Sequence, residues 1–417
     1  MLYKYQQETV DLIKEKGSLA LFLHMGLGKT LISLHAVKAL KVKNVLIVAP
    51  LLVANNVWGS EIDKWEDLKD LTYTKIIGTK KEREKALKKK SKVYIINYEN
   101  LDWLTSNYNC AFEMVIYDES SYLKNPTSKR FKAAKKIKPR HTLILTGTPT
   151  PQNFMDLWSQ IFLIDRGERL GKNITTFRNS YCYRRPHLKH VYFFNESMKD
   201  NLLNKIKDVS YSIASNSFEL PDINYIDIEI EMDLKAYKKF ESSYVYEDII
   251  CDTPAEMTNK LCQFANGFIY PDKKIHNLKI EMMKEIVDND SYLVVYNYKE
   301  DMVRLLEAYP EARIISDENI ELWNRGKLKI MLVHPKSASM GLNLQKGGSK
   351  IIWYSRTWNS AEYEQLNKRL HRNGQKEKVF VYHLMIKGTI EYKVKRALEM
   401  KFQNTKDLFS FLLDKKL

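Results

Sequence analysis

The sequence predicts an α/β fold with two parallel-sheet lobes and a mainly helical region between them. Short apolar segments recur early and late in the chain, and segments with apolar residues at helical spacing separate them. This alternation is typical of parallel sheets covered by helices on both faces. The 417 residues are enough for two or three domains. We expect a first lobe at 1–165, a helical insertion or linker region at 166–270 and a second lobe at 271–417.

The strands expected in the first lobe lie within residues 18–23, 44–50, 92–98, 112–119 and 141–149. A helix is expected over 30–40, directly after the first strand. From about 166 to 269 the pattern becomes long, charged and mostly helical, as in 197–209 and 234–250. Strands then resume within 292–298, 312–316, 329–335, 349–355 and 378–384. The second half therefore repeats the strand-rich pattern of the first.

The composition indicates a globular chain with a basic surface. Hydrophobic residues make up 44%, and 67 Lys and Arg against 51 Asp and Glu give a net charge of +16. Such an excess favours a polyanionic partner, most often nucleic acid, although basic charge also serves solubility. The four cysteines form no C-x-x-C pair, so we expect no structural zinc and no disulfide framework. A polar N-terminus and apolar runs too short for a membrane span predict a cytoplasmic protein without a membrane partner.

The stretch HMGLGKT, residues 24–30, resembles the end of a phosphate-binding loop. Gly26 and Gly28 permit a tight turn, after which backbone N–H groups at a helix N-terminus can bind phosphate. Lys29 would reach the β- and γ-phosphates, and the Thr30 hydroxyl would bind Mg²⁺. The usual pattern has glycine where this chain has Leu23, so an ordinary strand-to-helix turn is the alternative.

Two further motifs follow predicted strands of the first lobe. Asp118 and Glu119 end one strand, at the edge where open α/β sheets bind ligands. The first acid can hold Mg²⁺, and its neighbour can orient an attacking water. The segment 145–153, LTGTPTPQN, offers hydroxyls that can bond the acidic pair or a phosphate. The alternatives are a surface acid pair and an ordinary Gly-Pro turn.

The second lobe contains a basic helix pattern, EQLNKRLHRNGQ. Gln365, Arg369 and Arg372 stand at i, i+4 and i+7, and we expect them on one helix face. Two such arginines suit a triphosphate presented across a cleft, while a basic helix surface is the alternative. Gly341, upstream in SASMGLNL, would let a backbone approach phosphates. The lysine-rich segment 80–92 could follow a phosphate backbone, but the solvated face of a surface helix is favoured.

In this order the motifs resemble the superfamily-two helicases and, more narrowly, the Swi/Snf family of DNA translocases. The resemblance runs from Tyr5 to about Glu391. In that family the phosphate loop usually has the sequence MGLGKT. It implies two RecA-like lobes, ATP and Mg²⁺ as cofactors, and double-stranded DNA as the partner. A compact bacterial or phage member is the best fit, because no bromodomain, chromodomain or zinc module is visible.

The resemblance also implies roles for individual residues. Asp118 and Thr30 would bind Mg²⁺, and Glu119 would be the catalytic base or water positioner. The expected nucleotide-binding residues are Gln6 (adenine), Met25, Gly26, Leu27, Gly28, Lys29, Thr30, Gly341, Gln365, Arg369 and Arg372. Of these, Lys29, Arg369 and Arg372 would also act in catalysis. The expected DNA contacts are Pro50, Asn97, Tyr98, Asn297, Ser337, Trp358 and Asn359.

The chain departs from the family pattern in two places. Leu23 and His24 stand where the family usually has acids, and Ser121 stands where box II usually ends in histidine. Loss of that histidine could alter the coupling between DNA binding and hydrolysis. His24 is either a site residue or, as we favour, a structural histidine.

Three functions fit the sequence. The leading one is a monomeric ATPase motor that moves along double-stranded DNA and remodels DNA or protein–DNA complexes. The second is a strand-separating helicase acting on branched or single-stranded DNA or on RNA. The third is an ATP-switched clamp subunit of a larger nucleic-acid-processing or defence complex, whose other proteins would be partners. The intact set Lys29, Asp118, Glu119, Arg369 and Arg372 disfavours the third.

Overall fold

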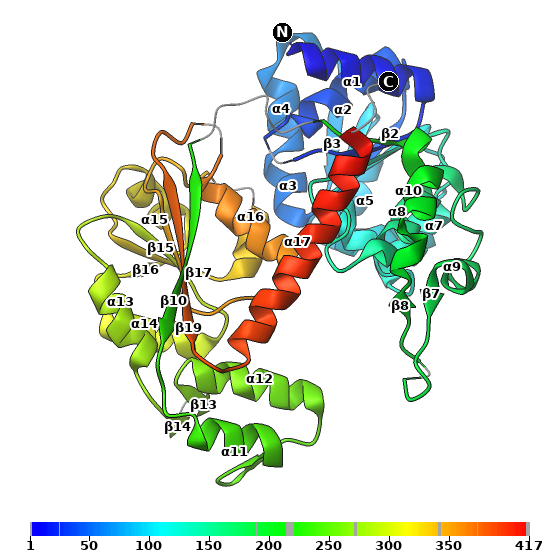
Figure 1. Cartoon of the computed structure of the whole chain (residues 1–417). Coiled ribbons are helices and arrows are strands. Elements are labelled where there is room, and N and C mark those ends of the chain that lie inside the picture. The colour runs from blue at the N-terminus through cyan, green and yellow to red at the C-terminus, as the bar shows by residue number, and fades with distance from the viewer. Residues whose placement is uncertain are drawn as a thin grey trace. The chain divides into compact units, whose positions relative to one another are not determined.

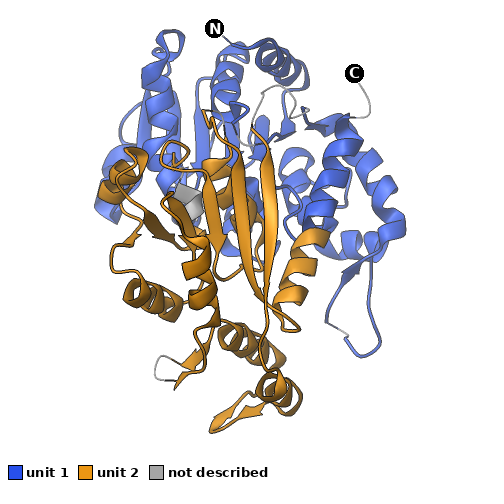
Figure 2. Ribbon diagram, turned by 60° about the vertical axis from the view of Figure 1, so that its left-hand side comes forward, with its two compact units in different colours: residues 1–217, 401–417 blue, residues 218–400 orange. Residues whose placement is uncertain are grey.

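Two separate parallel sheets organise the chain, one in each of two units (Figure 1). The computed structural model describes residues 2–24, 26–188, 190–213, 221–270, 273–340, 343–372 and 374–413. Unit 1 comprises residues 1–217 and 401–417, and unit 2 comprises residues 218–400 (Figure 2). Each unit has its own buried core and is described separately below.

The sheet of unit 1 has seven strands in the order β3-β4-β2-β5-β6-β1-β9, and every neighbouring pair is parallel. The central strands are apolar throughout because helices cover both faces, so β1 and β2 are buried at every position. The strands are β1 (Leu19–Phe22), β2 (Val45–Ala49), β3 (Tyr73–Ile76), β4 (Val93–Asn97), β5 (Met114–Asp118), β6 (His141–Thr146) and β9 (Ser210–Tyr211).

Helices connect these strands, as a parallel sheet requires. They are α1 (Lys4–Lys16), α2 (Lys29–Ala39), α3 (Leu51–Asn56), α4 (Trp58–Lys64), α5 (Lys80–Leu87), α6 (Leu101–Asn107), α7 (Lys129–Lys136), α8 (Leu157–Asp165), α9 (Ile174–Tyr181) and α10 (Lys199–Ile206), with a small hairpin of β7 (Cys182–Tyr183) and β8 (Phe193–Phe194). The lysine-rich α5 is a surface helix, as favoured from the sequence. A capping box between Thr79 and Glu82 starts it.

The sheet of unit 2 has six parallel strands in the order β10-β19-β18-β15-β17-β16. They are β10 (Ile223–Ile230), β15 (Tyr292–Val295), β16 (Arg313–Ile314), β17 (Ile330–Val333), β18 (Lys350–Trp353) and β19 (Val379–Ile386). Two hairpins pair β11 (Val245–Tyr246) with β12 (Ile249–Ile250) and β13 (Phe268–Tyr270) with β14 (Lys273–Lys274). The helices are α11 (Lys235–Ser243), α12 (Pro254–Ala265), α13 (Leu278–Ile286), α14 (Lys299–Ala308), α15 (Asp317–Asn324), α16 (Ser360–Leu370) and α17 (Glu391–Leu413).

These two parallel sheets confirm the predicted α/β fold class. The residues expected to form the helical region, 166–270, fall in both units. One strand in that region was not expected, and one helix is shorter than expected. Residues 223–230 form β10, whose alternation of isoleucine with polar residues is a strand pattern. Residues 234–250 form α11 and then the β11–β12 hairpin, because Tyr244 caps the helix in a left-handed backbone conformation. Glu247, also left-handed, lies in the turn between β11 and β12.

The end of α17 belongs to unit 1, although the sequence analysis grouped it with the second lobe. Leu408 and Phe409 are buried in the core of unit 1. The Thr405 and Thr150 hydroxyls lie 3.1 Å apart, and the ring of Phe409 packs on that of His24 with centroids 4.4 Å apart. Phe409, near the end of α17, therefore packs beside the segment that precedes α2.

All four cysteines are free thiols. Within the described ranges, none of the helices combines the length and apolar character that a membrane crossing requires.

A buried ion pair fixes the core of unit 2. Lys279 is fully buried on α13, and its Nζ donates to Glu391 Oε1 at 2.5 Å, Tyr354 O at 2.7 Å and Asn266 Oδ1 at 2.8 Å. Glu391, the first residue of α17, also accepts a hydrogen bond from the backbone N of Ile386. A charge buried this way is stable only while every partner is present.

Lys279→Met is expected to destabilise unit 2 by about 3–5 kcal/mol, because it leaves the Glu391 carboxylate buried without its cation. Native-state hydrogen exchange of the β18 and β19 amides measures this. Adding Glu391→Gln should recover part of the loss, since the amide oxygen still accepts from Ile386. The control is Lys274→Met in the exposed pair with Glu307, which should cost at most about 1 kcal/mol. Equal effects of Lys279→Met and Lys274→Met would contradict this account.

Candidate functional site

The carboxyl ends of three strands of unit 1 bring the predicted motifs together. β1 leads into residues 23–28, β5 ends at Asp118, and β6 ends at Thr146. The strand register places Phe22 beside Thr146 and Asp118 beside Leu145. Segments far apart in the sequence therefore meet at one edge of the sheet, where open α/β sheets bind ligands.

The loop between β1 and α2 has the backbone that a phosphate site needs. Gly26 and Gly28 have φ of 85° and 73°, in the left-handed region that favours glycine. A Cβ at Gly28 would also lie 2.3 Å from Gln6 Nε2, so the buried Gln6 amide packs directly on the loop. A Cβ at Gly26 would instead point into open space, with no described neighbour within 4 Å. Gly28 is the N-cap of α2, and the first N–H groups of a helix have no partner within the helix and can bind an anion.

The missing glycine at position 23 has a structural explanation. Leu23 is fully buried, and its backbone N donates to Thr146 O at 3.2 Å. It is therefore a residue of the sheet core and not of the loop. Lys29 Nζ donates to Leu23 O at 2.8 Å and to His24 O at 3.2 Å, so the lysine lies over the loop that precedes it. Met25 lies outside the described residues.

Burial disfavours the charged form of Asp118. Desolvation and the neighbouring Glu119 raise the pKa of Asp118 to about 6, against the opposing influence of Lys29. Trp58 Nε1 donates to Asp118 Oδ2 at 2.9 Å, and the Tyr98 hydroxyl donates to Asp118 O at 2.8 Å. A nearby cation would stabilise the carboxylate.

Hydroxyl groups hold Glu119 in place. Its Oε1 accepts from Thr146 Oγ1 at 2.8 Å, from Ser121 Oγ at 2.9 Å and, more weakly, from Thr148 Oγ1 at 3.4 Å. Its φ of 53° is unusual for a side chain with a Cβ and costs about 1–3 kcal/mol. The predicted bonds between the LTGTP segment and the acidic pair are therefore present, and Ser121 donates from the position where the family has histidine.

These residues fit a nucleoside triphosphate with Mg²⁺. The N-terminal N–H groups of α2 and the Lys29 ammonium suit phosphates. The oxygens of Thr30 and Asp118 are hard ligands of the kind Mg²⁺ prefers. Within the described ranges no cluster of three or more His, Cys, Asp or Glu could hold a metal by itself. A magnesium ion here would complete its coordination with phosphate oxygens and water.

In unit 2, α16 carries part of the predicted arginine set. Gln365 is buried and Arg369 is half-buried on this helix. The expectation that Arg372 shares their helix face is wrong, because α16 ends at Leu370 and His371 leaves the helical conformation. The side chain of His371 bonds Pro221 O at 2.7 Å, which holds the chain in its new direction. Burial lowers the pKa of Arg372. Gly341 lies outside the described residues.

A chain of hydrogen bonds holds α16 on the sheet of unit 2. The Tyr363 hydroxyl contacts His383 Nε2 at 2.8 Å, and His383 Nδ1 contacts Asp227 Oδ1 at 3.0 Å. Burial lowers the pKa of His383 to about 4, so the ring is neutral, and the pKa of Asp227 is lowered mainly by its bond from His383. Since Nδ1 must donate to the carboxylate, Nε2 accepts from Tyr363.

The residues of unit 1 expected to contact DNA differ in exposure. Pro50 caps α3 at the end of β2. Asn97, at the end of β4, is buried and bonds Glu99 and Asn100 through its side chain. Tyr98 is 1% exposed, and its hydroxyl is bonded to Asp118 O. In this structure the Tyr98 hydroxyl supports the acidic pair, and a contact of Tyr98 with DNA stays a prediction.

The corresponding residues of unit 2 follow β15, β17 and β18. Asn297 bonds Ser355 through both its backbone and its side chain. Ser337 is half-buried, and its N donates to His334 O. Trp358 is 38% exposed, while the Asn359 side chain caps α16 by accepting from the N–H groups of Ala361 and Glu362. Of these, Trp358 presents the largest accessible surface.

Two residues at the site were not found from the sequence. Trp58 supports Asp118 from α4, and Phe409 packs on His24 from the far end of the chain. Neither stands near its partner in sequence, and neither belongs to a motif with a chemical pattern. Only the fold shows these contacts.

Comparisons with known proteins show the family of the chain. The model of the SNF2-related domain family matches residues 5–319. The chain is 33% identical over 408 residues to protein p41 of Acyrthosiphon pisum secondary endosymbiont phage 1, covering 88% of this chain and 89% of p41. It is 24% identical over 436 residues to an uncharacterised ATP-dependent helicase, MG018 of Mycoplasma genitalium, covering 94% of this chain and 41% of MG018.

A similar solved structure is the Sulfolobus solfataricus SWI2/SNF2 ATPase core in complex with dsDNA, with 21% identity, a TM-score of 0.49, and coverage of 98% of this chain and 93% of that one. The chain belongs to the SNF2-related domain family. It is a DNA-dependent ATPase of the helicase-like, superfamily-two kind, and in general terms an ATP-driven DNA motor. It spans most of p41 but less than half of MG018.

Thr146→Val should leave ATP binding unchanged and slow ATP turnover by about tenfold, because it removes one hydroxyl donor to Glu119 without changing side-chain shape. Steady-state ATPase kinetics with a separate nucleotide-binding titration measure both quantities. The control is Thr142→Val on the same strand, which should hydrolyse ATP like the unaltered chain. Unchanged turnover in Thr146→Val would show that this hydrogen bond does not position Glu119.

Proposed function

We propose that the chain uses ATP hydrolysis to translocate on double-stranded DNA and thereby remodels DNA or protein–DNA complexes. The observation that carries this proposal is the meeting of the phosphate loop, the acidic pair and the Thr146 hydroxyl at one edge of the unit 1 sheet. Such an arrangement supports hydrolysis of a triphosphate. Membership of the SNF2-related domain family supports DNA as the track.

The proposed chemistry assigns one task to each group. Lys29 and the N–H groups of α2 bind the β- and γ-phosphates, and Gln6 contacts the adenine. Thr30 and Asp118 would hold Mg²⁺, which when bound would supply positive charge to the phosphates. Glu119 orients the attacking water through the carboxylate that the hydroxyls of Thr146 and Ser121 hold. From unit 2, Gly341, Gln365, Arg369 and Arg372 would complete the site when the units close.

DNA would be bound mainly through its phosphates. The candidate contacts remain proposals: Pro50, Asn97 and Tyr98 in unit 1 and Asn297, Ser337, Trp358 and Asn359 in unit 2. They offer amide, hydroxyl and ring contacts suited to a backbone and not to base edges. The net charge of +16 adds a sequence-independent attraction. We further propose a monomeric motor that acts in the cytoplasm, where a bacterial or phage-infected cell keeps its DNA.

A strand-separating helicase is the second candidate, because the relative MG018 is named as an ATP-dependent helicase. Both candidates use the same ATP site. They differ in which nucleic acid stimulates hydrolysis and in whether the strands part.

ATP turnover is expected to be low without nucleic acid and to rise with double-stranded DNA, because the duplex would favour closure of the two units. ATPase assays with duplex DNA, single-stranded DNA, RNA and no nucleic acid measure this. DNA affinity should fall by about 10³-fold or more between 50 and 200 mM salt, if six or more phosphate contacts release counterions.

The translocase should also displace the third strand of a triplex without opening the duplex beneath it. Stimulation by single strands alone, or efficient separation of a forked duplex, would contradict duplex translocation and favour the helicase.

A further inference from the structure

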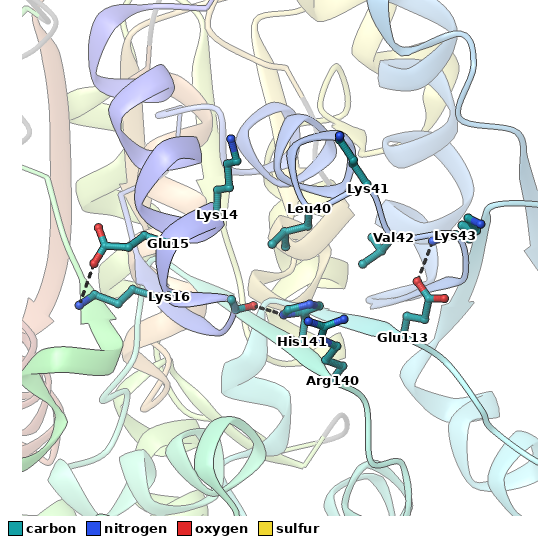
Figure 3. A pocket seen from close by; sticks show the side chains of 11 residues that line it. Lys14, Glu15, Lys16, Leu40, Lys41, Val42, Lys43, Glu113, Arg140 and His141 are labelled. Atoms are coloured by element: carbon teal, nitrogen blue, oxygen red, sulfur yellow. Dashed lines mark hydrogen bonds and ion pairs between the residues drawn. The ribbon is translucent and has the colours of Figure 1, made fainter.

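A basic hollow lies at the amino ends of the unit 1 strands, whereas the ATP site lies at their carboxyl ends. Its volume is about 630 Å³, and it is bounded by the residues that precede β1, β2, β5 and β6 (Figure 3). β1 is four residues long, or about 13 Å at the rise of a strand. One strand length therefore separates this hollow from the phosphate loop.

The walls of the hollow are tied together by hydrogen bonds. His141 Nδ1 donates to Gly17 O at 3.0 Å, and Glu113 Oε2 accepts from the backbone N of Lys43 at 2.9 Å. The backbone N of His141 donates to Glu113 O at 3.0 Å. Lys41 adopts a left-handed conformation, with φ of 54°, where the chain turns from α2 towards β2. The hollow is therefore a fixed feature of the strand starts and not a gap between loose side chains.

Positive charge dominates the lining. Lys14, Lys16, Lys41, Lys43 and Arg140 face two acids, Glu15 and Glu113, a formal excess of three positive charges. In Figure 3 the side chains of Lys14 and Lys41 lie across the hollow from those of Arg140 and His141. Burial lowers the pKa of His141, so its ring is neutral at pH 7 and adds no charge.

Four of these cations lack acidic partners among the described residues. Glu15 pairs with Lys16 at 3.4 Å, and Glu113 is bonded to the Lys43 backbone. Among the residues that the structure describes, no hydrogen bond or ion pair is formed by the side chains of Lys14, Lys41, Lys43 and Arg140. Like charges gathered around one hollow repel one another, and an anion bound among them would relieve that repulsion.

The chemistry of the lining indicates what kind of anion fits. Lysine ammonium groups on flexible stems act as point charges for phosphates, and Arg140 adds a planar donor fork. Among the lining residues the His141 ring is the one aromatic group, and Leu40 and Val42 are the apolar side chains. The lining therefore offers no platform of apolar rings on which a nucleobase would stack. The volume lies within the range of about 300–1,000 Å³ that small-ligand pockets have.

We propose that this hollow is a second, phosphate-specific site that binds a compact anion with two or more adjacent phosphate groups and no recognised base. It differs from the ATP site in its position and in needing neither the phosphate loop nor Mg²⁺. The proposal goes beyond the motor activity and does not depend on it.

The test measures binding of inorganic tripolyphosphate to the full chain by isothermal titration calorimetry without Mg²⁺. The Lys29→Ala variant serves as the background, because it removes the phosphate-loop lysine. In this background one equivalent is expected to bind. Adding Lys41→Glu and Arg140→Glu should weaken binding by at least about tenfold. A second pair, Lys14→Glu with Lys43→Glu, should weaken tripolyphosphate binding to a similar extent. Agreement between the two pairs would exclude a folding defect in the first pair as the cause.

The matched control adds Lys129→Glu and Lys138→Glu, which change the net charge equally at exposed positions outside the hollow. It should leave tripolyphosphate binding within about twofold of the background. An equal loss in the control, or no binding in the Lys29→Ala background, would overturn the proposal. It would also be overturned if the hollow variants lost affinity for duplex DNA but kept their affinity for tripolyphosphate, which would make this surface a nucleic-acid contact.

Discussion

The parallel register of β1, β5 and β6 is the constraint on which unit 1 depends. Because the three strands run the same way, their carboxyl ends meet at one edge, with Phe22 beside Thr146 and Asp118 beside Leu145. The Thr146 hydroxyl can then reach the Glu119 carboxylate, and Leu23 can bond the end of β6 while Lys29 lies over the loop. A shift of one residue in any of these strands would turn these side chains to the other face.

The same register gives the carboxyl and amino ends of the strands different chemistry. At the carboxyl ends of the strands, acids and hydroxyls stand beside Lys29. Burial there raises the pKa of Asp118, which favours a cation bound together with phosphates. At the amino ends, the residues between helices and strands are mostly basic and surround a hollow. The groups that line the hollow are therefore distinct from those of the ATP site.

Much of this could be predicted from the sequence, because strong apolar runs mark the central strands and the ATP motifs follow them directly. The edge strand β10 was missed because charged residues interrupt its isoleucines. The end of α16 at Leu370 was missed because helical spacing continues past it, and only the His371 contact with Pro221 shows the change of direction. Trp58 and Phe409 could not be found, since their roles depend on long-range packing that no local pattern encodes.

The measurement that tests the central claim most directly compares ATP binding and turnover in Glu119→Gln, with the exposed Glu66→Gln as the control. Glutamine keeps the shape of Glu119 but cannot accept a proton or carry charge. The account predicts that Mg²⁺-ATP still binds, because Lys29, Thr30 and Asp118 are intact, while turnover falls by about 10²-fold or more. Turnover equal to that of Glu66→Gln and of the unaltered chain would contradict the assignment of this edge of the sheet as the hydrolytic site.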